Sequence, residues 1–373
     1  MKRLLSLVLV FAMIFCLSAC AGKNDHERKK IGVITGPSAQ SGEEYRAAEK
    51  LQKKYGGEAV VTATFSEDFS SDQEKVVSTV TEMASDKNIK VIVIVPAVQG
   101  TADAIDKVRE TRDDIVFICG VCAEDPFYIA ERADICMLID EVVMGESAVD
   151  QAYKQGAKTF VHISFPRHLE YPHVSARRDL IMKRCQELGI RYVEATAPDP
   201  AGENGVTEAK KWISENVPKY VEEYGKDTAF FATNCSMQAT LIRKVAELGA
   251  ILPQQCCPSP YHGYPEALGI DISGHEGDVS YILGEIATKI AEYGNSGRMS
   301  TWQVPVNMVM VEAAVEYAIQ WCDRPEDSTY NEEVLLDKIK TAGGDGTTIT
   351  KYTDEAIGTL DNFYLIRCPY YDL

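Results

Sequence analysis

From Ile31 onward, short apolar runs rich in β-branched residues alternate regularly with longer amphipathic segments, and few folds accommodate this pattern. It is typical of parallel strands joined by crossover helices. Within 71–85 the apolar residues recur three and four positions apart, so one face of a helix there would pack on a sheet. The expected strands of the first half are 31–35, 59–65, 91–95 and 115–119, and the expected helices are 43–55, 71–85 and 101–111. We therefore predict an open, doubly wound α/β sheet.

A second series of the same kind begins near Asp134. Three of its helical patterns end at Gly156, Gly189 and Gly249, as the helix C-cap preference for positive φ would favour. The expected strands are 135–139, 159–163, 191–196 and 228–231, and the expected helices are 141–156, 173–189, 206–224 and 236–249. Because no long Pro/Gly/Ser linker separates the two series, we expect two hinged lobes around a cleft.

After Ile251 the pattern changes, and the order of the remaining elements implies two more crossings between the lobes. We expect helices at 279–293 and 308–321 around a short extended piece at 300–305, and hence a three-crossing hinge. The predicted boundaries are 31–122 plus about 262–303 for lobe 1, 123–261 plus about 304–322 for lobe 2, and 323–373 for a C-terminal extension.

The first residues have the pattern of an export signal. A basic head, Met1 to Arg3, precedes an uncharged apolar run, Leu4 to Leu17, that is too short to span a bilayer of about 30 Å. Small residues then lead to Cys20, which resembles the lipid-carrying cysteine of a bacterial lipobox; the alternative is an ordinary secretory peptide. We expect a signal peptide at 1–19, a lipid on Cys20, a polar tether at 20–30 and a location on the extracytoplasmic face of the cell membrane.

Charge and motif content exclude several functions. Lys and Arg number 38 against 56 Asp and Glu, a formal net charge of −18, so phosphate-driven binding to nucleic acid is not expected. No GxGxxG follows the first expected strand, and the sequence has neither a P-loop nor a GxSxG nucleophile motif. We expect no cofactor.

Four short stretches carry a family resemblance, and each follows or joins expected elements. They are Val174-Ser-Ala-Arg-Arg178, Ala232-Thr-Asn-Cys-Ser-Met237, Pro260-Tyr-His-Gly-Tyr-Pro-Glu266 and Ser300-Thr-Trp-Gln-Val-Pro305. With the element order over 31–321, they resemble the type I periplasmic-binding-protein superfamily of ribose- and galactose-type receptors and lactose-repressor cores. The whole chain also resembles an uncharacterised group of bacterial lipoproteins with this fold.

The resemblance implies which residues bind ligand in lobe 2. Arg177 matches a position from which sugar receptors send a guanidinium into the cleft, and we favour that role over the alternative of a solvated residue in a helix's first turn. Asn234 matches the first residue of the family's Asn-Asp-x-Met, with Cys235 in place of the Asp, and could alternatively be a helix N-cap.

The hinge stretches supply the other candidates. His262 stands where sugar receptors have a carboxylate, and it follows Tyr261. Gln303 matches a ligand-binding Gln of the last crossing, while Trp302 could cover a flat ligand or be buried in the hinge. Arg177 with His262 would suit a ligand that carries its own acceptors, such as a carboxylate.

Two pairs of cysteines leave a metal or redox site open. Cys119 and Cys122 have the spacing of such motifs, and Cys256-Cys257 lies near a later crossing, so four thiols could converge at the hinge. Adjacent cysteines are poor geometry for a tetrahedral site, and we read the remaining ones, Cys235 included, as buried apolar residues. We therefore predict no metal site.

Together these patterns favour a lipid-anchored solute receptor, not an enzyme. Its lobes would close on a small polar solute and present the closed form to an ABC permease or a sensor. One alternative is a metal- or thiol-redox lipoprotein on the same fold, and another is a hydrolytic enzyme that uses His262 in the cleft.

Overall fold

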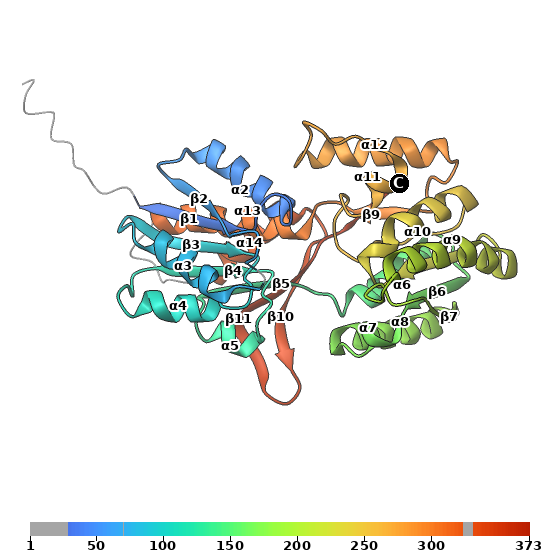
Figure 1. Ribbon diagram of the computed structural model, residues 1–373, viewed down its shortest axis with the longest axis horizontal. Coiled ribbons are helices and arrows are strands. Elements are labelled where there is room, and N and C mark those ends of the chain that lie inside the picture. Colours follow the sequence, from blue (N-terminus) through green and yellow to red (C-terminus); the bar gives the residue numbers. More distant parts are fainter. Residues whose placement is uncertain (1–28, 70, 324–330) are drawn as a thin grey trace, which may run out of the picture.

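The protein forms two α/β lobes that lie side by side (Figure 1). The computed structural model describes residues 29–69, 71–323 and 331–373. Lobe 1 has a seven-stranded sheet of order β10-β11-β5-β4-β3-β1-β2, in which β10 alone runs antiparallel to its neighbour. Its strands are β1 (Lys30–Thr35), β2 (Val60–Thr64), β3 (Ile89–Val95), β4 (Val116–Gly120), β5 (Ile135–Ile139), β10 (Thr348–Asp354) and β11 (Gly358–Arg367).

Helices cover both faces of this sheet. Along β3, Val91, Val93 and Val95 point into one apolar cluster and Ile92 and Ile94 into the other, which explains why the strand is apolar at consecutive positions. The first cluster includes residues of α2 (Gly42–Tyr55), α13 (Val306–Asp323) and α14 (Glu332–Gly343). The second includes residues of α3 (Gln73–Ala84), α4 (Thr101–Arg109) and α5 (Pro126–Ala130).

Lobe 2 has a parallel three-stranded sheet of order β7-β6-β8. Single parallel bridges, from Ala229 to Ile251 and from Leu252 to Met299, extend this sheet. The strands are β6 (Thr159–Ser164), β7 (Arg191–Thr196) and β8 (Thr228–Ala232). The helices are α6 (Met144–Lys154), α7 (Pro166–Leu169), α8 (Pro172–Leu188), α9 (Gly205–Tyr224), α10 (Cys235–Leu248), α11 (Tyr264–Leu268) and α12 (Val279–Glu292). The two apolar clusters of this lobe lie on opposite faces of its sheet.

The chain crosses between the lobes three times, which is the predicted number, but the crossing expected near residue 262 is replaced by one after β11. The crossings join β5 to α6, β9 (Ser300–Trp302) to α13, and β11 to β12 (Tyr370–Asp372). β12 returns to lobe 2 and pairs antiparallel with β9, so the last described residues are part of the hinge (Figure 1). The doubly wound α/β class is confirmed.

The predicted lobe boundaries differ from the structure in two places near the hinge. The strand at 135–139 was assigned to lobe 2, but β5 pairs with β4 and β11 in the lobe 1 sheet. The helix at 308–321 was also assigned to lobe 2, but the apolar residues of α13 pack on β1, β3 and α2 of lobe 1. Hydrophobic periodicity identified both elements correctly but could not show which sheet they join.

The boundaries predicted for 262–303 and 323–373 also differ from the structure, because local periodicity does not show which lobe an element joins. The region 262–303 was assigned to lobe 1, yet Ile282, Ile286 and Ile290 of α12 are buried in the lobe 2 core. The region 323–373 is not an appendage, because β11 pairs with β5 and Leu335 and Ile339 of α14 enter the lobe 1 core.

The predicted signal peptide at 1–19, the lipidated Cys20 and most of the tether lie outside the described residues. The last tether residue, Lys30, is the first residue of β1. Within the described ranges, no helix is both long enough and apolar enough to cross a membrane.

Candidate functional site

A cavity of about 560 Å³ lies between the lobes, beside the crossing segments. This volume is within the range of small-molecule sites, roughly 300–1,000 Å³. The residues of its wall come from both lobes and the hinge: Ser38, Ala39, Gln40, Gly42, Glu43, Glu44, Arg46, Val121, Ile139, Glu141, Cys256, Cys257, Pro258, Ser259, Tyr261, His262, Ile272, Glu276, Gly277, Asn307 and Met308.

The lobe 1 wall is formed by residues that follow the carboxyl ends of β1 and β4, where open α/β sheets bind ligands. After β4, Val121 has φ of 51°, in the left-handed region that a β-branched residue rarely occupies. Backbone strain of this kind costs on the order of 1–3 kcal/mol and is found most often at binding and catalytic sites. After β1, Glu44 is buried and accepts a 2.8 Å hydrogen bond from Nδ2 of Asn307, and burial raises the pKa of its carboxyl.

Glu43 connects the two walls. Its Oε1 accepts a hydrogen bond from Oγ of Ser259, which belongs to the lobe 2 loop after residue 252. Burial between the lobes desolvates the carboxyl and raises its pKa to about 7. The Ser259 hydrogen bond and His262 oppose the rise, whereas the neighbouring Glu44 adds to it.

The cavity is rich in hydrogen-bond acceptors. Four of its lining residues are glutamates: Glu43, Glu44, Glu141 and Glu276. The cationic side chain among the lining residues, Arg46, already donates a 2.7 Å hydrogen bond to Oε2 of Glu49. The wall therefore favours ligands that donate hydrogen bonds or carry positive charge.

Two of the six predicted ligand-binding residues, Tyr261 and His262, line the cavity. The hydroxyl of Tyr261 is buried and has no hydrogen-bond partner within the described part of the chain. Burial raises the pKa of this phenol, with Asp278 and Glu43 adding to the effect, so Tyr261 is a neutral donor available to a ligand.

Arg177 lies behind the cavity wall and is not one of the lining residues. It is 3% exposed, its guanidinium carbon is 5.5 Å from the ring centroid of Phe231, and Nη1 is 3.8 Å from Oε2 of the lining residue Glu141. Its Nε has no hydrogen-bond partner within the described ranges. The alternative of a solvated residue in the first turn is wrong, because α8 packs this side chain against α6 at Gly145.

The other three predicted binding residues do not line the cavity and instead contact neighbouring parts of the fold. Asn234 is the N-cap of α10, and its Oδ1 accepts from the backbone N–H of Ser236 at 3.0 Å. Trp302 is fully buried in the hinge, with its ring centroid 4.7 Å from that of Tyr370. Gln303 lies next to Gly344, and its backbone N–H donates to the carbonyl oxygen of Pro369.

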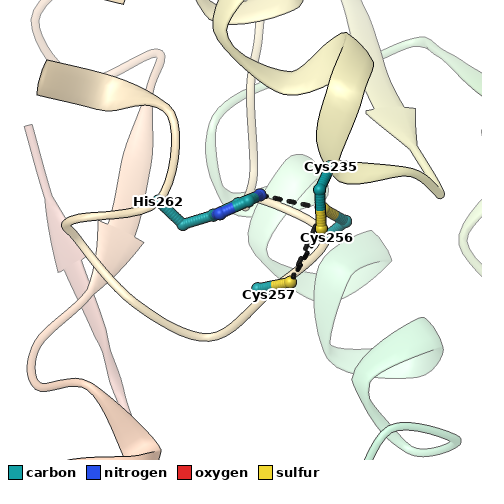
Figure 2. Close-up of side chains that lie close together, drawn as sticks. All are labelled: Cys235, Cys256, Cys257 and His262. Carbon is teal, nitrogen blue, oxygen red and sulfur yellow. Dashed lines mark hydrogen bonds between the residues drawn. The ribbon is translucent and has the colours of Figure 1, made fainter. Parts of the chain in front are cut away.

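The expected convergence of four thiols is wrong. Cys119 and Cys122 are buried in the α3/α4/α5 layer of lobe 1, where Cys122 Sγ lies 3.6 Å from the carbonyl oxygen of Cys119. Cys256 and Cys257 line the cavity instead and lie with Cys235 and His262 (Figure 2). The cause is topological, because β4 ends in the lobe 1 sheet, whereas the Cys256 loop follows the lobe 2 sheet.

Sequence reasoning missed Cys235 and the glutamates of the wall. Cys235 opens α10 after the short loop that follows β8, so its place near the carboxyl end of a parallel strand was a usable signal. Glu43 and Glu44 had a similar signal, since they open the helix after β1. The approach of Ser259 to Glu43 depends on the tertiary contact between lobes, which no local pattern encodes.

Two α/β lobes joined by three crossings around an interlobe cavity have the type I periplasmic-binding-protein fold. Within it, the chain belongs to DUF3798, a family of proteins of unknown function whose sequence model matches residues 29–300. Two uncharacterised proteins of Treponema pallidum (strain Nichols) are relatives. One is 31% identical to this chain over 58% of this chain and 98% of its own length. The other is 36% identical over 46% of this chain and 80% of its own length.

Solved structures share the fold. A Clostridium difficile 630 protein named as a candidate transcriptional regulator has a TM-score of 0.84 at 23% identity, covering 92% of this chain and 99% of its own. A sugar ABC transporter protein from Actinomyces odontolyticus ATCC 17982 has a TM-score of 0.53 at 11% identity, covering 94% and 97%, respectively. The fold is thus shared with a protein of a sugar ABC transporter.

Proposed function

We propose that this protein is a lipid-anchored, extracytoplasmic solute receptor whose lobes close on a small ligand and present the closed form to an ABC permease or a sensor. The observation that carries the proposal is the interlobe cavity, which has walls from both lobes beside a three-crossing hinge. A solute that touches both walls favours the closed form, because only that form provides all of its contacts.

The chemistry of the wall supports a neutral or cationic solute rich in hydrogen-bond donors. The sequence had suggested an acceptor-bearing ligand held by Arg177 and His262, but Arg177 faces Glu141 from behind the wall. The glutamates of the wall would accept hydrogen bonds from amines and hydroxyls, and those that are ionised would repel a carboxylate ligand.

A melting-temperature screen of the full chain tests this proposal. We expect stabilisation by members of a panel of diamines, amino sugars and polyols at millimolar concentration, and none by dicarboxylates of matching size. Glu141→Gln should reduce the stabilisation by at least half, whereas Glu215→Gln, on the exposed face of α9, should leave it unchanged. Stabilisation by dicarboxylates alone would contradict the proposed ligand chemistry.

The membrane location is supported by the sequence before residue 29. Cys20→Ser should move the protein from the membrane fraction to the soluble fraction and abolish incorporation of labelled fatty acid. Cys322→Ser, which changes a cysteine of α13, is the matched control. A Cys20→Ser protein that stays in the membrane fraction would rule out the lipid anchor.

A further inference from the structure

Four side chains of the kinds that ligate metals meet at the lobe 2 edge of the cavity (Figure 2). Cys235 is the first residue of α10, and Cys256, Cys257 and His262 belong to the loop that leads to α11. One ligand atom from each residue lies within 4.8 Å of all the others. These residues come from two segments about twenty positions apart, so the fold, not local sequence, brings them together.

Four of the six separations between the ligand atoms are close to the edges of a tetrahedron around one metal ion. With Zn–S bonds of about 2.3 Å and Zn–N bonds of about 2.0 Å, tetrahedral angles place two sulfurs ~3.8 Å apart and a sulfur and a nitrogen ~3.5 Å apart. The Sγ of Cys235 is 3.7 Å from that of Cys256 and 3.3 Å from that of Cys257. Cys256 Sγ is 3.9 Å from Cys257 Sγ and 3.2 Å from Nε2 of His262.

Adjacency of Cys256 and Cys257 is therefore no obstacle to coordination. Their side chains diverge enough for the two sulfurs to occupy neighbouring corners of the tetrahedron. The sequence-based expectation of poor geometry did not include the bend at 256–258, which sets the directions of the two side chains.

Hydrogen bonds outside the cluster hold the loop that carries Cys256 and His262. Gln255 is buried, and its Nε2 donates to the carbonyl oxygen of Ser259 at 2.9 Å, to that of His262 at 3.3 Å and to Oγ1 of Thr301 at 2.8 Å. The backbone N–H of Cys256 donates to Oε1 of Gln238 at 3.1 Å. The loop is thereby fixed before any ion binds, as a metal site requires.

Cys235 is the first residue of α10, at the N-terminal end of the helix, where the helix dipole favours a negatively charged group such as a metal-bound thiolate. All three cysteines are free thiols, and Cys235 is exposed to solvent, which gives an ion a path to the cluster.

We infer that Cys235, Cys256, Cys257 and His262 form a tetrahedral binding site for Zn²⁺ or a similar thiophilic divalent cation. Binding would form three metal–sulfur bonds and one metal–nitrogen bond, and the thiol protons would pass to solvent. Four protein ligands complete the coordination, so the ion has a structural role, fixing the lobe 2 wall of the cavity to α10. The inference does not depend on the proposed solute-receptor function.

Cobalt titration of the full chain, purified in reduced and metal-free form, tests the inference. We expect one equivalent of Co²⁺ to produce the visible ligand-field bands and near-ultraviolet thiolate charge transfer of tetrahedral coordination, and one equivalent of Zn²⁺ to displace it. Zn²⁺ should also raise the melting temperature. Loss of a direct ligand in Cys235→Ser or His262→Ala should weaken Co²⁺ binding by about 100-fold or more, since even supporting residues contribute 10–100-fold.

Controls make the outcome unambiguous. Cys235→Ser changes an exposed residue, so its metal-free form should melt close to wild type, and Cys322→Ser should bind Co²⁺ as wild type does. The inference is overturned if wild type gives no tetrahedral cobalt spectrum, if Cys322→Ser weakens binding as much as Cys235→Ser, or if anaerobically isolated protein contains a Cys235–Cys257 disulfide. Failure of these tests would leave the amine and polyol screen unaffected.

Discussion

At the scale of single residues, His162 shows how burial sets an acid limit to stability. It is fully buried in β6, between the rings of Tyr192 and Phe231, and neither ring nitrogen has a hydrogen-bond partner within the described ranges. Desolvation lowers its pKa to about 3, with Arg177 adding to the effect. The folded protein therefore keeps His162 neutral where the unfolded chain, with a pKa near 6.5, takes up a proton.

This difference predicts that the His162 contribution to stability is present above about pH 6.5 and is lost as pH falls, by about 2 kcal/mol at pH 5. His162→Leu should remove that part of the loss. Urea denaturation of both proteins at pH 7.5 and pH 5 measures it, with His275→Gln, an exposed histidine, as the control. An equal loss in wild type and His162→Leu would contradict the assignment.

The raised pKa of Glu43 predicts the opposite dependence of stability on pH. Because enclosure raises its pKa from 4.5 to about 7, the folded state holds a proton that the unfolded chain releases, and stability falls as pH rises from about 4.5 to about 7. Glu43→Gln should gain stability relative to wild type by on the order of 2 kcal/mol between pH 5 and pH 8. Denaturation curves of both proteins at pH 5 and at pH 8 check this. The control Glu58→Gln, at an exposed residue, should show no such gain in stability.

Several residue roles could be predicted from the sequence, and others could not. The N-cap alternative for Asn234 and the buried alternative for Trp302 were both readable from residue type. The cluster of Cys235 with His262 was not, because it requires knowing that the loop after Leu252 returns to the first turn of α10.

At the scale of elements, the close contact of α6 with α8 holds Arg177 behind the cavity wall. A Cβ atom at Gly145 would lie 2.5 Å from the backbone oxygen of Arg177 and 2.9 Å from its Cγ. Gly145→Ala should therefore destabilise the protein by about 1–3 kcal/mol through overpacking, despite the better helix propensity of Ala.

The matched control for this prediction is Gly284→Ala in α12, where a Cβ would contact nothing within 4 Å. That substitution should stabilise the protein by up to about 1 kcal/mol. Guanidinium denaturation of both variants gives the comparison. If Gly145→Ala were as stable as Gly284→Ala, the helix contact would be looser than described.

Element order was largely predictable from hydrophobic periodicity, and lobe membership was not. β5 reads equally well as the last strand of one sheet or the first of the next, and its partner β11 lies more than 200 residues away in sequence. The sheet extension by β10 and β11 was missed for the same reason, because its strands join an edge that local patterns do not identify.

At the scale of the whole molecule, the hinge, the cavity and the Cys235 cluster lie together where the two lobes meet. Three crossings join the lobes, Glu43 and Ser259 meet across the cavity, and the Cys235 cluster lies at one wall. The fold could be predicted because two series of strands and helices recur, whereas the acidic character of the cavity depends on side chains from both lobes.

The central claim is that a solute closes the lobes, and small-angle X-ray scattering of the Cys20→Ser protein tests it most directly. We expect the diamine, amino sugar or polyol that most raises the melting temperature to reduce the radius of gyration, and Glu141→Gln to diminish that change. A solute that stabilises the protein while the radius of gyration stays constant in wild type would contradict closure on the interlobe cavity.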